Sequence, residues 1–171
     1  MTFEEIKNKI INRFGEEMIL AEQTSYLQPQ LIVDKNRIEE LCLFLRDDSE
    51  LYFDYLHCLS GVDYAADQQE LAVVYHLNSI PYKHSIVLKV MLSLDRASTV
   101  LPRCPSVSNV WRTADWHERE AFDLYGIQFI NHPDLRRILC PDDWEGFPLR
   151  KDYKEAEMYK GLKITFEKNY D

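Results

Sequence analysis

Two stretches near the start of the chain carry apolar residues at helical spacing. In the first, Thr2 and Glu5 can form a capping box and Gly15 is a typical stop signal. In the second, Asp34 can serve as the N-cap. The apolar residues that share a helical face are Ile6, Ile10 and Phe14 in the first stretch and Ile38, Leu41, Cys42 and Leu45 in the second. The pattern predicts two amphipathic helices.

Between and after these helices the apolar residues alternate, as they do in half-buried strands. Met18 to Ala21 and Leu31 to Val33 are predicted to be short strands joined around Pro29. Three longer segments follow, and their expected buried positions are Leu51, Phe53, Tyr55 and Leu59, then Leu71, Val73, Tyr75 and Leu77, then Ile86, Leu88, Val90 and Leu92. The turn around Pro81 predicts that the last two segments form an antiparallel hairpin.

These elements predict an α+β fold, with helices on one face of a largely antiparallel or mixed sheet. A short helix and an extended C-terminal segment are expected to follow. A chain of 171 residues suits one ordinary core. The pattern changes between Asp95 and Pro105, so we expect a core unit over residues 1–95. Residues 96–171 would supply the later elements and form one structural unit with that core.

The third predicted helix runs from Trp116 to Tyr125, with Asp115 as N-cap, Glu118 closing a capping box and Gly126 as stop. Its apolar arc contains Ala114, Ala121, Phe122 and Tyr125. Arg119 and Asp123 lie roughly opposite that arc, four residues apart, and are expected to form a surface ion pair.

Glu118 falls in the middle of the apolar arc, where a carboxylate is unexpected. A buried carboxylate needs a cationic or hydrogen-bonding partner, because leaving it alone costs several kcal/mol. Arg136 and Arg137 are the expected partners, since they follow the turn made by His132, Pro133 and Asp134. The alternative is that Glu118 only completes the capping box and points to solvent.

The segment from Cys140 to Tyr153, called the strap below, contains two prolines and a glycine and has no helical period. Its aromatic residues Trp144, Phe147 and Tyr153 distinguish it from a disordered linker. It is expected to be extended and ordered, lying either on its own domain or on a partner. In the second case Arg150 and Asp152 would supply charged contacts.

Composition and charge argue against two classes of protein, those that bind nucleic acids and those that span a membrane. The net charge of −9 argues against a nucleic-acid partner, although Arg136, Arg137, Arg150 and Lys151 form one local basic group. Hydrophobic residues make up 46% of the chain, but no apolar run approaches the roughly 20 residues that span a bilayer. No signal peptide opens the chain, so a cytoplasmic protein is expected unless a partner holds it at a membrane.

Resident cofactors and catalysis are also not expected. The four cysteines, Cys42, Cys58, Cys104 and Cys140, lack the short spacing of zinc and iron–sulfur sites, and the first two sit in apolar segments typical of a core. No nucleotide-binding or nucleophile motif is present. Glu118 and Glu120 point about 200° apart on a helix, so they cannot flank one scissile bond. The histidines lack any nucleophile–base spacing.

Three motif blocks carry a resemblance to a known family. ERE-x-FDLYGI-x-F, HPDLRRIL and DWEG-x-PLRKDY occur in this order with short gaps, after the lead-in SV-x-x-VW-x-x-ADW. Together they closely resemble the 30-kilodalton subunit of respiratory complex I, also called its C subunit. The residues that match the family signature and its expected interface are Glu118, Arg119, Glu120, Asp123, Gly126, His132, Asp134, Arg136, Arg137, Trp144, Pro148, Arg150, Asp152 and Tyr153. Lys154 departs from the family, which often has proline there.

The resemblance implies a structural and assembly subunit of the hydrophilic arm of the proton-pumping NADH:quinone oxidoreductase. In the family, FMN and iron–sulfur clusters lie on partner subunits, and electrons pass from NADH to quinone. This chain would carry no cofactor, metal or catalytic residue and would support chiefly the quinone-site, 49-kilodalton-type subunit. It would lie peripherally on the cytoplasmic side of the cell inner membrane. The alternative is a free-standing small enzyme that uses Glu118, His117 and Arg136 in a pocket.

Overall fold

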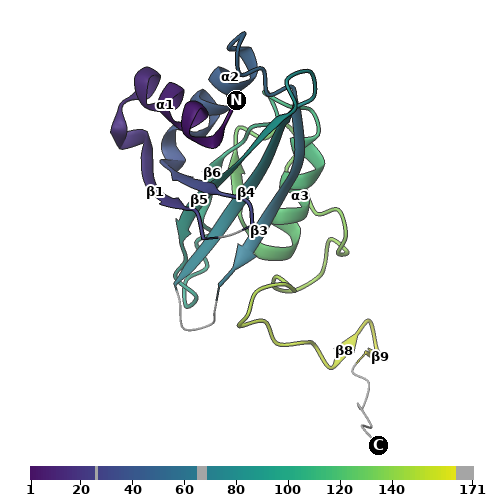
Figure 1. Ribbon diagram of the computed structural model, residues 1–171. Helices are drawn as coiled ribbons and strands as arrows, with labels where there is room; N and C mark the ends of the chain where they lie inside the picture. Colours follow the sequence, from purple (N-terminus) through teal and green to yellow (C-terminus); the bar gives the residue numbers. More distant parts are fainter. Residues whose placement is uncertain (26, 65–68, 165–171) are drawn as a thin grey trace, which may run out of the picture.

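The computed structural model describes residues 1–25, 27–64 and 69–164, which form three α-helices, two short 3-10 helices and nine strands (Figure 1). The elements in chain order are α1 (Phe3–Phe14), η1 (Glu16–Met18), β1 (Ile19–Gln23), β2 (Gln30–Val33), η2 (Lys35–Arg37), α2 (Ile38–Asp47), β3 (Tyr55–Asp63), β4 (Glu70–Ser79), β5 (His84–Ser93), β6 (Arg103–Pro105), α3 (Ala114–Tyr125), β7 (Gln128–Ile130), β8 (Met158–Tyr159) and β9 (Leu162–Lys163).

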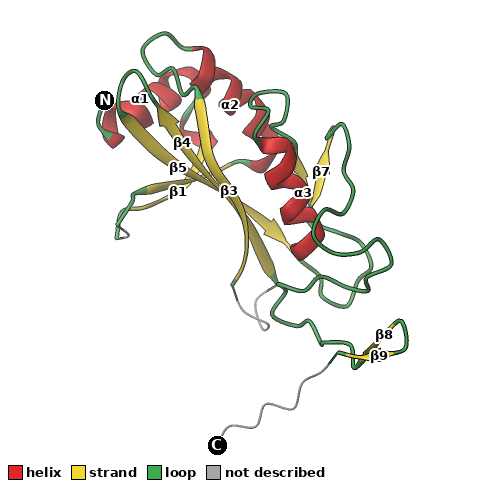
Figure 2. Ribbon diagram, turned by 90° about the vertical axis from the view of Figure 1, so that its right-hand side faces the viewer, coloured by secondary structure: helices red, strands yellow, loops and turns green. Residues whose placement is uncertain are grey.

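The main sheet has the strand order β1-β2-β5-β4-β3. All neighbouring strands are antiparallel except β2 and β5, which are parallel. The three α-helices lie on one side of this sheet, as Figures 1 and 2 show. The predicted α+β class with a mixed sheet is confirmed.

The two N-terminal helices begin as their sequences predict. Thr2 and Glu5 form the complete capping box of α1, and Gly15 ends the helix at φ 90°. Asp34 caps the turn η2, which leads directly into α2, so the predicted cap lies one short element earlier than expected. Every apolar residue predicted to face inward on these two helices is buried. The apolar spacing therefore decides which face each helix packs on the sheet.

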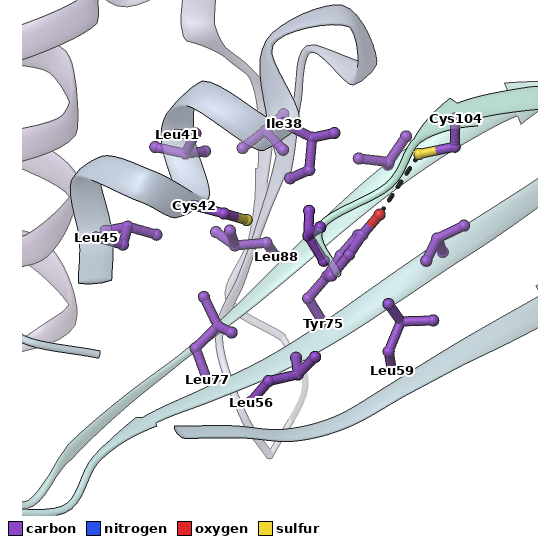
Figure 3. Close-up of a cluster of buried hydrophobic side chains, with 14 of the residues drawn as sticks. Ile38, Leu41, Cys42, Leu45, Leu56, Leu59, Tyr75, Leu77, Leu88 and Cys104 are labelled. Carbon is purple, nitrogen blue, oxygen red and sulfur yellow. Dashed lines mark hydrogen bonds between the residues drawn. The ribbon is translucent and has the colours of Figure 1, made fainter. Parts of the chain in front are cut away.

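The predicted hairpin is β4–β5, and its residues pair in one continuous antiparallel register. The eight alternating residues from Leu71 to Leu77 and from Ile86 to Leu92 are all buried. Figure 3 shows Tyr75 among them, with its hydroxyl 3.4 Å from the Cys104 sulfur, and Cys42 on α2. The core assignment of Cys42 is confirmed, whereas Cys58 is only half-buried.

The prediction for the strand before this hairpin is partly wrong. The strand β3 spans Tyr55–Asp63 and not residues 51–59, and Tyr55 is 39% exposed. A register shift between Leu56 and Cys58 breaks the simple alternation, as a bulge does. Leu51 and Phe53 are buried as expected, but they precede the strand.

Residues after the hairpin belong to the same core. The parallel pair β6–β7 and the helix α3, with the loops beside them, contribute Cys104, Val107, Trp111, Ile127 and Phe129 to the apolar cluster beneath the sheet. Beyond them the described chain continues as loop to the small hairpin β8–β9, which lies away from the sheet in both overall views (Figures 1 and 2). Within the described ranges, no helix is long and apolar enough to cross a membrane.

Candidate functional site

The helix α3 carries several of the family-signature residues, and it begins earlier than predicted. Its N-cap is Thr113, whose side chain makes no capping bond, and Asp115 lies inside the first turn. The predicted Asp115 cap and its capping box with Glu118 are therefore wrong. Backbone bonds from Val110 and Trp111 to Val107 form turns that lead into the helix and start it without a side-chain cap. Gly126 is the left-handed C-cap at φ 70°, as predicted.

Glu118 is buried, with 0% of the residue exposed, so the predicted burial is confirmed and the solvent-facing alternative is wrong. Its predicted pairing with Arg136 or Arg137 is also wrong. One carboxylate oxygen accepts from the Ser106 hydroxyl at 2.5 Å and the other accepts from the Val107 N–H at 2.7 Å. Burial raises the pKa of Glu118 to about 7, although these two donors act in the opposite direction.

Arg136 and Arg137 have separate partners. Arg136 is exposed and pairs with Asp134 at 2.8 Å, whereas Arg137 pairs with Asp123 at 2.6 Å. The Arg119 guanidinium donates to the backbone carbonyls of both arginines at 3.3 Å. Arg119 is thus buried beneath the segment that follows β7, and the predicted surface pair of Arg119 with Asp123 is wrong.

Asp123 is the centre of the first anchor of the strap, and 0% of the residue is exposed. Besides the Arg137 guanidinium, its carboxylate accepts backbone N–H bonds of 2.7 to 3.0 Å from Ile138, Leu139 and Cys140. Burial alone would raise the pKa of Asp123, but these N–H groups and Arg137 outweigh it and hold the pKa below its usual value. The helical spacing did not predict this role, because the segment from Arg137 to Cys140 covers a helix face that would otherwise be exposed.

Arg137 extends the first anchor into the strap itself. Its second terminal nitrogen donates to the carbonyls of Trp144 at 3.0 Å and Gly146 at 2.9 Å. The Phe147 ring lies near two guanidinium groups, 5.6 Å from that of Arg137 and 4.4 Å from that of Arg150. One side chain therefore joins the helix, the turn before the strap and the strap's middle.

A second anchor forms at Asp63, the last residue of β3. Its buried carboxylate accepts two bonds from Arg96, at 2.6 and 3.0 Å, and one from the Lys151 N–H at 2.9 Å. Arg96 also pairs with Asp152 at 2.8 Å. Sequence reasoning missed Asp63 and Arg96, because nothing in their local spacing links them to residues more than fifty positions away.

Between the anchors, the strap covers the C-terminal end of α3. Arg150 donates to the Tyr125 carbonyl at 2.7 Å, and the Leu149 N–H donates to the Leu124 carbonyl at 3.1 Å. The Trp144 indole donates to the Tyr153 hydroxyl at 3.1 Å, and Pro148 is half-buried beside Phe147. The strap packs on its own domain, and Arg150 and Asp152 both bind within this chain. It is not fully extended as predicted, because backbone hydrogen bonds close turns over residues 141–144, 147–150 and 150–153.

The residues of the alternative enzyme hypothesis do not form a common pocket in the described part of the chain. Glu118 faces Ser106 and Val107, and Arg136 pairs with Asp134 at the surface. His132, and not His117, has a ring nitrogen near Glu118, at 3.9 Å. Glu120 is exposed on α3. A cavity of about 680 Å³ is lined by Arg46, Tyr52 and Trp111 among others, and by none of the three proposed catalytic residues.

Comparisons with known proteins agree with the motif blocks. Residues 31–159 match the family model described as respiratory-chain NADH dehydrogenase, 30 Kd subunit. The C subunit of NADH-quinone oxidoreductase from Chlorobium phaeobacteroides is 44% identical over 155 residues, covering 90% of each chain. That of Chloroherpeton thalassium is 44% identical over 97% of this chain, which spans only 65% of that protein's length.

A solved structure also shares the fold. A chain of the membrane-bound sulfane sulfur reductase, an archaeal respiratory membrane complex, superposes with a TM-score of 0.72. The alignment covers 97% of this chain and 96% of that one at 21% identity, which supports the fold alone. From the family model and the bacterial relatives, we conclude that this chain belongs to the family of the 30-kilodalton subunit of respiratory-chain NADH dehydrogenase.

Proposed function

We propose that this chain is a structural subunit of the hydrophilic arm of NADH:quinone oxidoreductase and transfers no electrons itself. The observation that supports this role is that several family-signature residues make contacts within the chain that hold the strap in place. Asp123, Arg137, Arg150 and Asp152 hold the strap against the domain, because each makes at least one hydrogen bond or ion pair with another group of the same chain. In this proposal FMN and the iron–sulfur clusters lie on partner subunits, and the assembled complex passes electrons from NADH to quinone coupled to proton translocation.

The proposed docking surface is the C-terminal hairpin β8–β9. Two of its four strand residues expose large apolar side chains, Met158 at 55% and Leu162 at 71%. The hairpin lies away from the sheet, while the strap before it is held firmly at both anchors (Figure 2). Exposed apolar groups on a positioned segment are suited to burial against a neighbouring subunit. We assign that neighbour chiefly to the quinone-site, 49-kilodalton-type subunit, on the cytoplasmic side of the inner membrane.

The double variant Met158→Glu/Leu162→Glu tests this assignment. We expect the variant chain to fold normally, because both side chains are exposed, but to be lost from the membrane-bound complex. Circular dichroism of the purified chain reports folding, and a native gel of solubilised membranes with quinone reduction by NADH reports assembly. The matched control is Leu20→Glu on β1, since Leu20 is 63% exposed on the main sheet, and it should assemble normally. Normal recovery of the hairpin variant in the complex would contradict the proposed docking surface.

Arg150→Glu is a weaker test, because it would not distinguish attachment of the strap to its own domain from docking to a partner. Arg150 binds the Tyr125 carbonyl and packs on Phe147, so reversing its charge would disturb the strap's own attachment before any partner contact.

The cofactor assignment has a separate test. The purified chain should contain no stoichiometric iron, zinc or flavin by metal analysis and absorbance, and finding any of them would overturn it.

A further inference from the structure

Glu118 has a partner set that is unusual for a buried carboxylate. Its two hydrogen-bond donors are neutral, the Ser106 hydroxyl and the Val107 N–H, and the residue is fully buried between α3 and the loop after β6. Throughout the described ranges, no lysine or arginine forms an ion pair with it. A buried carboxylate without a counter-charge is costly to keep ionised, so proton binding is the ordinary way to relieve the cost.

Among the described residues, the ring nitrogen near Glu118 belongs to His132, whose Nε2 lies 3.9 Å from a Glu118 carboxylate oxygen and 3.5 Å from an Asp115 carboxylate oxygen. The Nδ1 atom of His132 lies 3.0 Å from the Asp134 N–H and must accept from it, so Nδ1 carries no proton. The Nε2 atom then carries the proton and donates to the Asp115 carbonyl at 3.0 Å. The hydrogen bonds of both ring nitrogens of His132 therefore go to residues other than Glu118.

Two acidic groups near Glu118 favour its neutral form. Asp115 on α3 and Glu39 on α2 are acidic, and both raise the pKa of Glu118. The remaining groups whose charges couple to it are Cys42 on α2, Tyr75 on β4 and Cys104 on β6. Burial raises the pKa of each of these three, which keeps them uncharged at neutral pH. The positive charge of Lys35 on η2 lowers the pKa of Cys104, but burial has the larger effect and raises it. Burial is the largest cause that brings the pKa of Glu118 to about 7.

Two serine hydroxyls let the site satisfy its hydrogen bonds in both protonation states. The Ser106 hydroxyl oxygen lies 2.5 Å from Glu118, 2.7 Å from the Ser108 hydroxyl and 3.1 Å from the Ser108 N–H. When Glu118 is ionised, Ser106 donates to it and accepts from both Ser108 groups. When Glu118 is protonated, it donates to Ser106, which donates to the Ser108 hydroxyl instead. Only hydrogens change places.

We propose that Glu118 is a reversible proton-binding site in which the Ser106 and Ser108 hydroxyls reorient as the carboxyl group gains or loses its proton. The proton comes from water and returns to it, and Ser108, which is half-buried, lies on the outer side of Ser106. The site joins α3 to the loop that follows β6, so the protonation state of one carboxyl group sets how strongly these two elements are held together.

Direct titration of the full-length chain tests the proposal. With ¹³C-labelled glutamate, the Glu118 carboxyl resonance should titrate with a midpoint near 7, and the Val107 amide should shift with the same midpoint. Ser106→Ala should move the midpoint upward, because it removes a donor that favours the ionised form. A wild-type midpoint near the ordinary value of 4.5 would overturn the proposal. A midpoint that Ser106→Ala leaves unchanged would overturn the role of the hydroxyls.

Unfolding equilibria give an independent readout. Because the folded pKa lies above the unfolded value, Glu118 favours the folded state at low pH, and this advantage is lost as pH rises from 4.5 through about 7. Across that window the unfolding equilibrium constant of wild type should rise on the order of a hundredfold because of Glu118. Glu118→Gln imitates the protonated form, so its unfolding constant should lack this rise. Glu120→Gln, an exposed change on the same helix, is the matched control and should follow wild type. Equal pH dependence of Glu118→Gln and wild type would overturn the proposal.

Discussion

The sheet domain and the strap are ordered by different interactions. The domain is held by apolar side chains at regular spacing, such as Leu77 and Leu88 on neighbouring strands, both fully buried. The strap has few buried apolar groups, and its path is fixed where Asp63 and Asp123 accept several donors each. Apolar packing is distributed over many contacts, whereas the strap depends on two carboxylates. Single polar substitutions should therefore have large effects in the strap, and apolar substitutions should have large effects in the core.

The largest effect is expected for Asp123→Ala. The substitution leaves the Arg137 guanidinium and the N–H groups of residues 138–140 without their shared acceptor, so the free energy of unfolding should fall by about 3–5 kcal/mol. Denaturant unfolding followed by circular dichroism measures the change. Asp134→Ala, which removes an exposed partner of Arg136, is the control and should change stability little. A small change for Asp123→Ala would mean that the strap is held mainly elsewhere.

A core substitution should affect the two regions in the opposite way. Leu88→Ala removes a fully buried side chain of β5 and should cost about 3 kcal/mol of global stability. Hydrogen exchange should then be faster in β4 and β5. The free energy of local opening of the strap, without unfolding of the whole domain, should not change. Leu20→Ala, at an exposed position of β1, is the control. If Leu88→Ala selectively exposed residues 138–140, the two regions would not be separable.

Gly126 lies where the two regions meet, and its substitution should have a smaller effect. A Cβ atom there would come within 2.6 Å of the Arg150 guanidinium and of the Phe147 ring, at a left-handed φ of 70°. Gly126→Ala should cost roughly 1 kcal/mol for the backbone and about 1–2 kcal/mol more for displacing the strap. Gly161→Ala is a matched control, because φ is 81° there and no atom lies within 4 Å of the added Cβ. Stability is measured by thermal unfolding. Equal losses of stability for both variants would show that the strap moves away from the added Cβ at no measurable cost.

The smallest effect near neutral pH, growing only in acid, concerns the two anchors. Burial alone would raise the pKa of Asp63 and Asp123, but their N–H donors and arginines outweigh it and lower both pKa values below the ordinary 3.8. Their stabilisation is therefore present above pH 3.8 and is lost as pH falls through the folded pKa values. Amide exchange of Ile138 to Cys140 should accelerate selectively in that window. If the core amides lost protection first, the strap would not be the acid-sensitive region.

Local sequence patterns were sufficient for most of the domain. Apolar spacing identified the inward faces of α1 and α2, and alternation identified the hairpin β4–β5 and its buried residues. These predictions succeeded because helix and strand periods are properties of the backbone itself. The alternation failed at β3, where a bulge shifts the register and depends on the partner strand. The same periodicity correctly placed Glu118 on the buried face of α3.

The sequence by itself determined the α+β class, the core faces, the burial of Glu118, the Gly126 stop and, through its motif blocks, the family. Only the tertiary structure decided which polar groups meet. Glu118 binds Ser106 and Val107, and Asp123 is buried because the segment from Arg137 to Cys140 lies over it. Apolar burial needs only a face, and a repeating pattern encodes a face. A hydrogen bond needs one donor within about 3 Å of one acceptor, and that distance is set by how remote segments fold together.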